Sequence, residues 1–296
     1  MRKQLNLIAA LLCCCTLAQA RAPLVLLTDF GTQDGAVSAM KGVAYSVSQQ
    51  LVISDLSHDN PDIFTGAYRL YQAEQFWPKG TVFVCVVDPG VGTARLSVVL
   101  KTRTGHYFVG PNNGLLSLVA ERDGIEGLRQ IDERVNRRRG SQNSYTFHGR
   151  DVYGYTGARL AAGVIRFEQV GPLLAPAALI SIAYRKPALD GNKITGLIPV
   201  LDVQFGNVWS NIPQTLFDQL HVAVGDPIRV RVYHQDRLVD DSVAPYRRTF
   251  GEVPVGKPLV YVNSLLNLAV ALNQGSYAAA HKIDSGPDWS IEIGTQ

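Results

Sequence analysis

Cysteine is scarce in this chain of 296 residues, and its few cysteines are unevenly placed. Three of the four, Cys13, Cys14 and Cys15, lie within the first twenty residues, so the rest of the sequence contains only Cys85. A single cysteine cannot form an intrachain disulfide, and it cannot supply the clustered thiolates of a structural zinc site. Stability must therefore come from a hydrophobic core, for which the chain is long enough.

The first twenty residues have the composition of a secretory signal peptide. Arg2 and Lys3 form a positive start, residues 5–17 form an apolar stretch, and Ala18-Gln19-Ala20 is a cleavage site of small residues. We therefore expect residues 1–20 to be removed and the protein to be exported, either to the periplasm or to the medium.

After residue 20 the sequence also lacks long apolar runs and an excess of either charge. No later run approaches the roughly 20 apolar residues that a membrane span needs. The net charge of +3 falls to +1 when Arg2 and Lys3 leave, because no acidic residue leaves with them. Neither a nucleic acid nor a membrane is therefore expected as a partner.

The first half of the chain alternates apolar strands with helical segments. Two strand–helix–strand units in succession predict parallel strands with right-handed crossovers, as in an α/β domain. Residues 132–140, which include four arginines, are expected to form a solvated loop. The predicted strands are 24–28, 51–55, 81–87, 96–101 and 106–109, and the predicted helices are 36–47, 62–76 and 151–163, with one more that ends near residue 120.

The pattern changes in the second half of the chain. Prolines interrupt residues 171–190, which predicts an irregular connection. Short strands with turns between them then follow, at 194–203, 227–234 and 258–262, and only residues 265–272 are predicted to be helical. We divide the chain into a signal peptide (1–20), an N-terminal α/β domain (21–182), a linker (183–192) and a smaller, mainly β domain (193–296).

Acidic side chains stand at the ends of three predicted strands, at Asp29, Asp55 and Asp88. A single aspartate after a strand is usually a helix cap or a turn former. Three at one edge of a parallel sheet favour a ligand crevice instead, because such folds bind ligands beyond the carboxyl ends of their strands. A glycine-containing turn leads from Asp88 to Arg95, and His148 lies in a second polar cluster.

Other common catalytic sites have no support in the sequence. His58 and His148 lack the i, i+4 partner of a helical zinc motif, so no metal is expected. No Gly-x-Ser-x-Gly elbow follows a strand, as a Ser-His-Asp hydrolase of the α/β type would need, and Gly90-Val-Gly92 lacks the lysine of a phosphate loop. His148 taken alone could be a structural histidine, and its polar neighbours leave a catalytic role open.

Residues 201–212 are the densest mixture of polar and aromatic side chains in the second half. An asparagine amide such as that of Asn207 both donates and accepts, which suits the edge of a purine, and Phe205 could stack on its face. Gly206-Asn207 could also simply close a hairpin. Both interpretations stay open at this point.

Taken together, these segments resemble the S-adenosyl-L-methionine (SAM) hydroxide adenosyltransferases, a family of SAM hydrolases related to the SAM-dependent fluorinase and chlorinase. The resemblance spans nearly the whole chain after residue 20. It is carried by residues 27–35 (LTDFGTQDG), 87–95 (VDPGVGTAR), 108–114 (FVGPNNG), 146–151 (TFHGRD) and 202–212 (DVQFGNVWSNI).

The resemblance implies a three-layer α/β/α domain with a mainly parallel sheet and a smaller β-barrel-like domain. It also implies a homotrimer whose sites lie between subunits, with SAM as substrate and no cofactor. The catalytic residues that it implies are Asp88, Arg95 and His148. The substrate-binding residues are Asp29 at the ribose, Asp34 in the same motif, Phe147, Asp202 near the methionine amine, Phe205, Asn207 at the adenine and Ser264 near the methionine carboxylate.

Three differences from the halogenases favour water over halide as the nucleophile. Gly149 stands where halogenases carry a serine, Asp88 stands where the fluorinase has a tyrosine, and residues 102–105 replace a long insertion. Attack of water on the 5′ carbon would release methionine, whose sulfur leaves as a neutral thioether and needs no general acid. Asp88 and His148 would orient the water and accept its proton, and Arg95 would stabilise negative charge. The alternatives are a halogenase of the same fold and an exported, non-catalytic nucleoside-binding protein.

Overall fold

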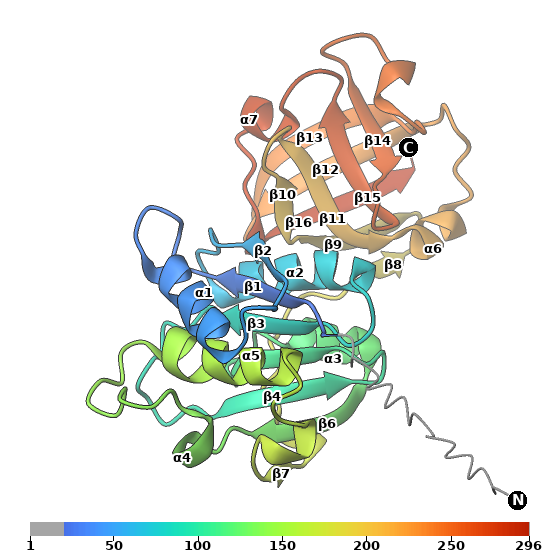
Figure 1. Ribbon diagram of the computed structural model, residues 1–296. Helices are drawn as coiled ribbons and strands as arrows, with labels where there is room; N and C mark the ends of the chain where they lie inside the picture. The colour runs from blue at the N-terminus through green and yellow to red at the C-terminus, as the bar shows by residue number, and fades with distance from the viewer. Residues whose placement is uncertain (1–20, 296) are drawn as a thin grey trace, which may run out of the picture.

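The computed structural model describes residues 21–295, which form two domains (Figure 1). The N-terminal domain contains a seven-stranded sheet, and the C-terminal domain contains two antiparallel sheets. This confirms the predicted fold class, an α/β domain followed by a mainly β domain. The predicted signal peptide lies outside the described residues.

The N-terminal sheet has the strand order β2-β1-β3-β5-β4-β6-β7. β1 pairs in parallel with β2 and β3, and β3 pairs in parallel with β5, as the two strand–helix–strand units predict. β4, β6 and β7 add antiparallel pairs at the far side. The strands are β1 (Leu24–Thr28), β2 (Ile53–Ser57), β3 (Val82–Val86), β4 (Ser97–Thr102), β5 (Tyr107–Pro111), β6 (Ile125–Gln130) and β7 (Leu173–Leu174).

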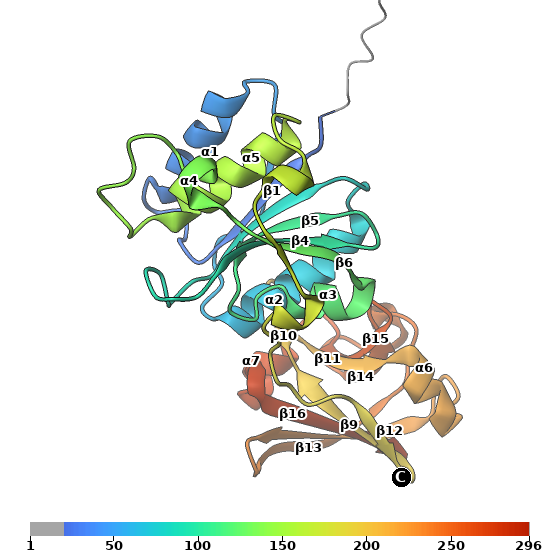
Figure 2. The same cartoon turned by 90° about the horizontal axis from the view of Figure 1, so that it is seen from below.

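Helices cover both faces of this sheet (Figure 2). α1 and α5 lie on one face, and α2 and α3 lie on the other, between the sheet and the C-terminal domain. α2 begins where predicted because the Asp62 carboxylate accepts a hydrogen bond from the Thr65 N–H at 2.9 Å. The helices are α1 (Ala36–Val47), α2 (Ile63–Ala73), α3 (Ser117–Asp123), α4 (Glu133–Asn136) and α5 (Tyr155–Ala161).

The two central strands are buried on both sides, since helices pack against each face. No side chain of β1 or β3 is more than 2% exposed. Along β3, Phe83 and Cys85 join the cluster under α2 and α3, and Val84 joins the cluster under α1 and α5. Each such burial stabilises the fold by about 1.5–3 kcal/mol relative to exposure. The sheet is therefore a rigid platform for whatever its strand ends carry.

The C-terminal domain packs a four-stranded sheet, β10-β11-β15-β14, against a five-stranded one, β13-β12-β16-β9-β8. The 183–192 segment, predicted as a linker, includes β8, which pairs with β9. The elements are β8 (Ala188–Asp190), β9 (Lys193–Ile198), β10 (Val200–Asp202), β11 (Asn207–Pro213), α6 (Gln214–Phe217), β12 (Pro227–His234), β13 (Arg237–Pro245), β14 (Pro258–Val262), β15 (Asn267–Leu272), α7 (Tyr277–His281) and β16 (Gly286–Thr295).

One predicted helix in this domain is wrong. Residues 265–272 form a turn and then β15, a strand that lies between β11 and β14. Its residues 268–271 are fully buried, because the sheet has neighbours on both faces. A short, continuous apolar run has no periodicity that separates a buried strand from a buried helix. Pairing with two strands decides the outcome here.

The two domains touch along α2 and the chain that follows Arg185. The Arg69 guanidinium, on α2, donates to the Leu201 carbonyl at 3.1 Å, and the Asn211 amide donates to the Arg185 carbonyl at 3.0 Å. In residues 21–295 no helix combines the length and the apolar character needed to cross a membrane.

Candidate functional site

The carboxyl ends of β1 and β3 bring two predicted acids together. Asp29 follows β1 directly, Asp88 lies two residues after β3, and the two strands are neighbours. The Asp88 N–H donates to the Asp29 carboxylate at 3.1 Å. Partial desolvation raises the pKa of Asp29 above its usual range, and the negative charge of Asp88 adds to that increase. The carboxyl edge of the sheet therefore brings these two side chains into contact.

The third acid, Asp55, does not lie at a strand end, so this part of the prediction is wrong. β2 runs two residues later than predicted and places Asp55 in its middle. The Asp55 carboxylate bonds to Lys41 at 2.6 Å and to His58 at 3.1 Å. Burial alone would raise the pKa of Asp55, but these two partners lower it. Asp55 is thus a paired structural carboxylate.

Asp88 and Arg95 form a bidentate pair. Arg95 Nε lies 2.6 Å from Asp88 Oδ1, and its Nη2 contacts the other carboxylate oxygen. The side chains are only 5% (Asp88) and 9% (Arg95) exposed. Burial alone would lower the pKa of Arg95, but the bond to Asp88 outweighs this effect and raises it. The turn between them closes through the bond from the Val91 N–H to the Asp88 carbonyl, and Gly92 has a φ of +82° that favours glycine.

His148 lies beside this pair, at the start of a π-helical turn at Gly149–Gly154 that leads into α5. Its imidazole is buried, and its ring centre is 6.3 Å from that of Tyr153, over which Arg95 also lies, at 5.8 Å. The predicted catalytic set Asp88, Arg95 and His148 is therefore gathered around one tyrosine.

The charges around His148 favour its neutral form. Burial lowers the pKa of His148, and Arg95 and Arg137 lower it further against the opposing carboxylates of Glu133 and Asp88. The imidazole is therefore uncharged over more of the pH range than a solvent-exposed histidine would be.

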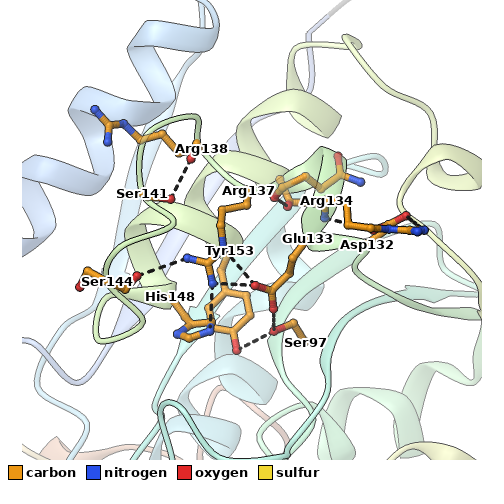
Figure 3. A network of polar contacts seen from close by, with 12 residues as sticks. Ser97, Asp132, Glu133, Arg134, Arg137, Arg138, Ser141, Ser144, His148 and Tyr153 are labelled. Carbon is orange, nitrogen blue, oxygen red and sulfur yellow. Dashed lines mark hydrogen bonds and ion pairs between the residues drawn. The ribbon is translucent and has the colours of Figure 1, made fainter.

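The loop predicted at residues 132–140 also contributes to this site, so its interpretation as wholly solvated is wrong. α4 turns Arg137 inward, where its Nη2 lies 2.6 Å from Glu133 Oε2 and 3.4 Å from His148 Nε2 (Figure 3). The interpretation does hold for Arg134, whose side chain is 88% exposed. The i, i+4 spacing of Glu133 and Arg137 was a signal for their ion pair, but it does not show that Arg137 is buried.

Two other predicted residues lie nearby with structural contacts. Phe147 packs edge-on against Phe30, with ring centres 5.5 Å apart. The Asp34 carboxylate accepts from the Ala36 N–H at 2.8 Å and so satisfies a free donor at the start of α1. Their predicted roles in substrate binding stay predictions.

The C-terminal domain has a cavity of about 900 Å³. The residues that line it come from positions 202–276. They include all four of the substrate-binding residues predicted in this domain, which are Asp202, Phe205, Asn207 and Ser264. Asp29, Asp88 and Arg95 of the N-terminal domain are not among the residues that line this cavity.

The turn between β10 and β11 shapes one wall of the cavity. The N–H groups of Phe205 and Gly206 donate to the Asp202 carbonyl at 3.2 and 2.7 Å, and the Asn207 amide donates to the Asp202 carboxylate at 3.0 Å. Gly206 has a φ of +67°. The hairpin interpretation is confirmed, and the predicted ligand contacts stay predictions that are compatible with it, because these side chains also line the cavity.

Two donors in the cavity lining are unused. Trp209 Nε1 and Asn263 Nδ2 are buried and form no hydrogen bond of good geometry among residues 21–295, although the Trp209 N–H lies close to the Tyr261 hydroxyl and opposes the rise that burial causes in the pKa of that phenol. The Asn263 carbonyl oxygen, by contrast, accepts from Leu265 and Asn267 N–H groups at 2.9 and 3.1 Å, which fixes the amide. Buried donors without partners are uncommon, and a ligand with acceptor atoms would satisfy them. Sequence reasoning did not single out either residue.

Within the part of the chain that the structure describes, there is no group of three or more histidine, cysteine, aspartate or glutamate side chains placed to hold a metal ion.

Relatives match nearly the whole chain. A (R)-S-adenosyl-L-methionine hydrolase from Salinispora tropica is 37% identical over 272 residues, which cover 90% of this chain and 96% of the relative. A fluorinase from Actinoplanes sp. is 29% identical over 290 residues, with 89% and 95% covered. The crystal structure of an uncharacterised conserved protein from Thermotoga maritima matches with a TM-score of 0.84 at 34% identity, covering 92% of this chain and 99% of the other.

These comparisons contradict the predicted export to the periplasm or the medium. That prediction depended on residues 1–20 alone, which lie outside the described residues. The hydrolase and the fluorinase are named for their enzyme activities, and neither name marks an exported protein. The charged and apolar pattern of residues 1–20 is therefore not sufficient to predict export, and the prediction of an exported protein is wrong.

The two domains each match a family model, in the order in which they follow one another in the structure. The model of the SAM hydroxide adenosyltransferase N-terminal domain matches residues 24–171, and that of the C-terminal domain matches residues 196–290. The limits that we predict for the domains stay predictions. The matches confirm the resemblance drawn from the sequence, and the chain belongs to the SAM hydroxide adenosyltransferase family.

Proposed function

We propose that the protein hydrolyses SAM to adenosine and L-methionine through attack of water on the 5′ carbon of the ribose. Relatives named as (R)-S-adenosyl-L-methionine hydrolases support this activity. The observation that carries the proposal is the buried cluster of Asp88, Arg95 and His148 beside the ends of β1 and β3.

The chemistry needs an activated water more than it needs an acid. As the bond from the 5′ carbon to sulfur breaks, its electron pair stays on sulfur and methionine leaves as a neutral thioether. Water must meanwhile lose a proton as it forms the new bond from oxygen to carbon. Asp88 and His148 orient the water, and one of them accepts its proton. Arg95 stabilises the developing negative charge on oxygen.

Magnitudes show what the cluster can contribute. A cation 4 Å from a developing unit charge is worth about 4 kcal/mol at an effective dielectric constant of about 20, which corresponds to about three powers of ten in rate. The contribution of Arg95 falls below that bound, because Asp88 already neutralises it through two contacts. Placing the water in line with the breaking bond supplies the larger share of the barrier reduction, about 7 kcal/mol.

Substrate binding is divided between the domains in this proposal. Asp29 holds the ribose hydroxyls, and Asp34 and Phe147 lie on the same side. Asp202, Phe205, Asn207 and Ser264 bind the adenine and methionine ends in the C-terminal cavity. We infer a homotrimer in which this cavity faces the acids of a neighbouring subunit. The support is that each domain carries only one part of the set and that the family resemblance implies such a site.

Hydrolysis is tested with purified protein and SAM in water enriched in oxygen-18. We expect adenosine that carries the heavy oxygen at the 5′ position, together with methionine, by mass spectrometry. Because the relatives are named for the (R) form, the two sulfonium epimers are assayed separately. Adenosine without the heavy oxygen would contradict attack of water at carbon. Arg95→Ala should lose most of this activity, and Arg229→Ala is its matched control, since Arg229 forms a similar bidentate pair with Asp241 at the surface of the C-terminal domain.

The same assay separates the alternatives. Added chloride or fluoride would give 5′-halo-adenosine if the protein were a halogenase, and tight binding with no methionine release would indicate a binding protein. A Cβ at Gly149 would lie 2.9 Å from Phe30 Cζ, so the serine that the resemblance assigns to halogenases has no room unless Phe30 moves. We therefore expect water, and not halide, to be the nucleophile.

The shared site is tested by complementation. Asp88→Asn and a Trp209→Ala/Asn263→Ala variant, each inactive alone, are co-expressed with different tags and purified through both. A closed ring of three that contains both variants has one interface at which both parts are intact, so purification through both tags should give about a third of the sites if each site uses two chains. No recovery would mean that one chain supplies both parts.

A further inference from the structure

The Arg137 guanidinium lies against His148 and contacts one particular nitrogen of its ring. Arg137 Nη2 is 3.4 Å from His148 Nε2, and both side chains are buried (Figure 3). A guanidinium only donates hydrogen bonds, so Nε2 must present its lone pair. In a neutral imidazole the single proton is then on Nδ1. The contact therefore selects one tautomer.

Arg137 is held in place from several sides. Its Nε and Nη2 donate to Glu133 Oε2 at 3.1 and 2.6 Å, its Nη1 donates to the Ser144 carbonyl at 3.5 Å, and the group stacks on Tyr145 at 4.7 Å. Ser97 links Glu133 to the Tyr153 hydroxyl, with contacts of 3.4 and 3.3 Å. The guanidinium thus cannot easily turn away from His148.

His148 Nδ1 is the unsatisfied atom of this network. It is buried and has no hydrogen-bond partner within residues 21–295. A buried N–H without an acceptor is unfavourable, so this donor is suited to an oxygen that the chain itself does not supply. The groups that face the ring are the cations Arg95 and Arg137, the carboxylates Glu133 and Asp88, and the phenols Tyr145 and Tyr153. A second proton on Nε2 would point at the Arg137 donors.

We propose that Arg137 is a positioning residue that keeps His148 neutral with its proton on Nδ1, so that His148 donates a hydrogen bond to the attacking water. This inference rests on the proposed hydrolysis. The N–H of His148 holds one lone pair of the water oxygen while the other attacks the 5′ carbon. The water proton passes to the Asp88 carboxylate and then to solvent, and the electron pair of the broken bond stays on sulfur. Asp88, not His148, is the base.

The tautomer is measured directly, without turnover. The full chain with nitrogen-15 histidine is examined by long-range proton–nitrogen NMR, and His148 is assigned by the peaks that are lost in His148→Gln. We expect the pattern of an Nδ1–H, Nε2-unprotonated ring. In Arg137→Met the pattern should change toward Nε2–H, and Arg137→Lys should preserve part of the original pattern. The matched control is Arg134→Met on α4, whose exposed side chain should leave the spectrum unchanged.

An Nε2–H ring in the unaltered protein would overturn the proposal, and so would an unchanged pattern in Arg137→Met. Thermal melting shows whether Arg137→Met folds. If it does not, the tautomer of His148 is judged from the spectra of the unaltered protein and of Arg137→Lys, and an Nε2–H ring in the unaltered protein still overturns the proposal. These results do not depend on SAM being the substrate, so a failure here is distinct from a failure of the proposed hydrolysis.

Kinetics then separate a donor from a base. The amide nitrogen of His148→Asn can occupy the place of Nδ1, whereas His148→Gln presents its amide near Nε2. We expect His148→Asn to retain kcat within about tenfold. His148→Gln should lose about a hundredfold or more in kcat, which is the low end of the effect of losing a side chain that takes part in proton transfer. Equal losses in both variants would indicate a base and overturn the proposal.

Discussion

The two domains use buried polar groups in opposite ways. On the first sheet, Asp88 and Arg95 are buried and fully paired with each other. In the C-terminal cavity, Trp209 and Asn263 bury donors that have no partner among the described residues. The charged pair is complete before any substrate arrives, whereas the neutral donors, which include His148 Nδ1 beside that pair, lack an acceptor within residues 21–295. We propose that the charged pair of the N-terminal domain serves the reaction and that the donors of the C-terminal cavity serve recognition.

Physical chemistry accounts for the difference. An isolated charge in a buried place is too costly to keep, so a catalytic carboxylate and guanidinium must neutralise each other in advance. A neutral N–H without a partner costs only about 1–3 kcal/mol, a cost that a bound acceptor removes. Variants of the Asp88–Arg95 pair should therefore lower kcat, and variants of the donors in the C-terminal cavity should raise KM.

The largest effect is expected at Arg95. Arg95→Lys keeps the charge but loses the fork that contacts both Asp88 oxygens, and a lysine is not equivalent at a bidentate site. We expect kcat to fall by about 10²–10³, as for loss of one preorganised donor, with KM changed by less than about threefold. Steady-state kinetics measure both constants.

Arg229→Lys is the control for this change, because it alters a bidentate pair of the same kind on the exposed face of β12 and β13. A raised KM with an unchanged kcat in Arg95→Lys would break the comparison, since the pair would then serve binding.

A smaller effect is expected at Trp209. Trp209→Phe removes the unpartnered N–H and keeps most of the ring, so it should raise KM about tenfold, the loss of roughly one hydrogen bond to a ligand. The kcat should stay the same. The melting temperature without substrate should fall little, because the donor that is removed has no hydrogen bond of good geometry among residues 21–295 and only the Tyr261 hydroxyl close by.

Trp289→Phe provides the matched control. Trp289 stacks on His234 at 4.6 Å on the other sheet of the same domain, away from the cavity lining. A Trp209 variant that lowers kcat and leaves KM unchanged would place the ring in the reaction and not in recognition.

The sequence predicted the secondary structure of the N-terminal domain better than that of the C-terminal domain, and the reason is physical. Strands such as β1 and β3 are apolar nearly throughout and lead to an acid, and α1 has helical periodicity, so local pattern and fold agree. β15 is also mostly apolar, but no local feature shows that two antiparallel neighbours pair with it.

The site shows the same limit at the level of single side chains. Motifs identified Asp88, Arg95 and His148, and the structure gathers them around Tyr153. Arg137 was missed because three of its neighbours in the chain are also arginines, and a run of like charges usually faces solvent. Its contacts with His148, Glu133 and Tyr145 distinguish it from the exposed Arg134. Which member of a charged run turns inward is decided by packing that a local pattern does not contain.

The smallest effect concerns Asp29, an acid of the first domain that is proposed to bind the ribose. The pKa of Asp29 is raised in the folded chain above its ordinary value of 3.8, mainly by desolvation. A raised pKa means that the folded state holds the proton more tightly than the unfolded state. The stability that this supplies is present below the unfolded value and is lost as pH rises through the folded value.

At neutral pH the charged Asp29 therefore slightly destabilises the fold, and Asp29→Asn should melt slightly higher there while KM for SAM rises. Asp241→Asn should behave in the opposite sense, because Arg229 lowers the pKa of Asp241, whose contribution is present at neutral pH and lost on acidification. Melting curves of both variants between about pH 4 and pH 8 measure this contrast. If Asp29→Asn melted lower at neutral pH, Asp29 would be a stabilising acid, and the ribose would have to be bound by another group.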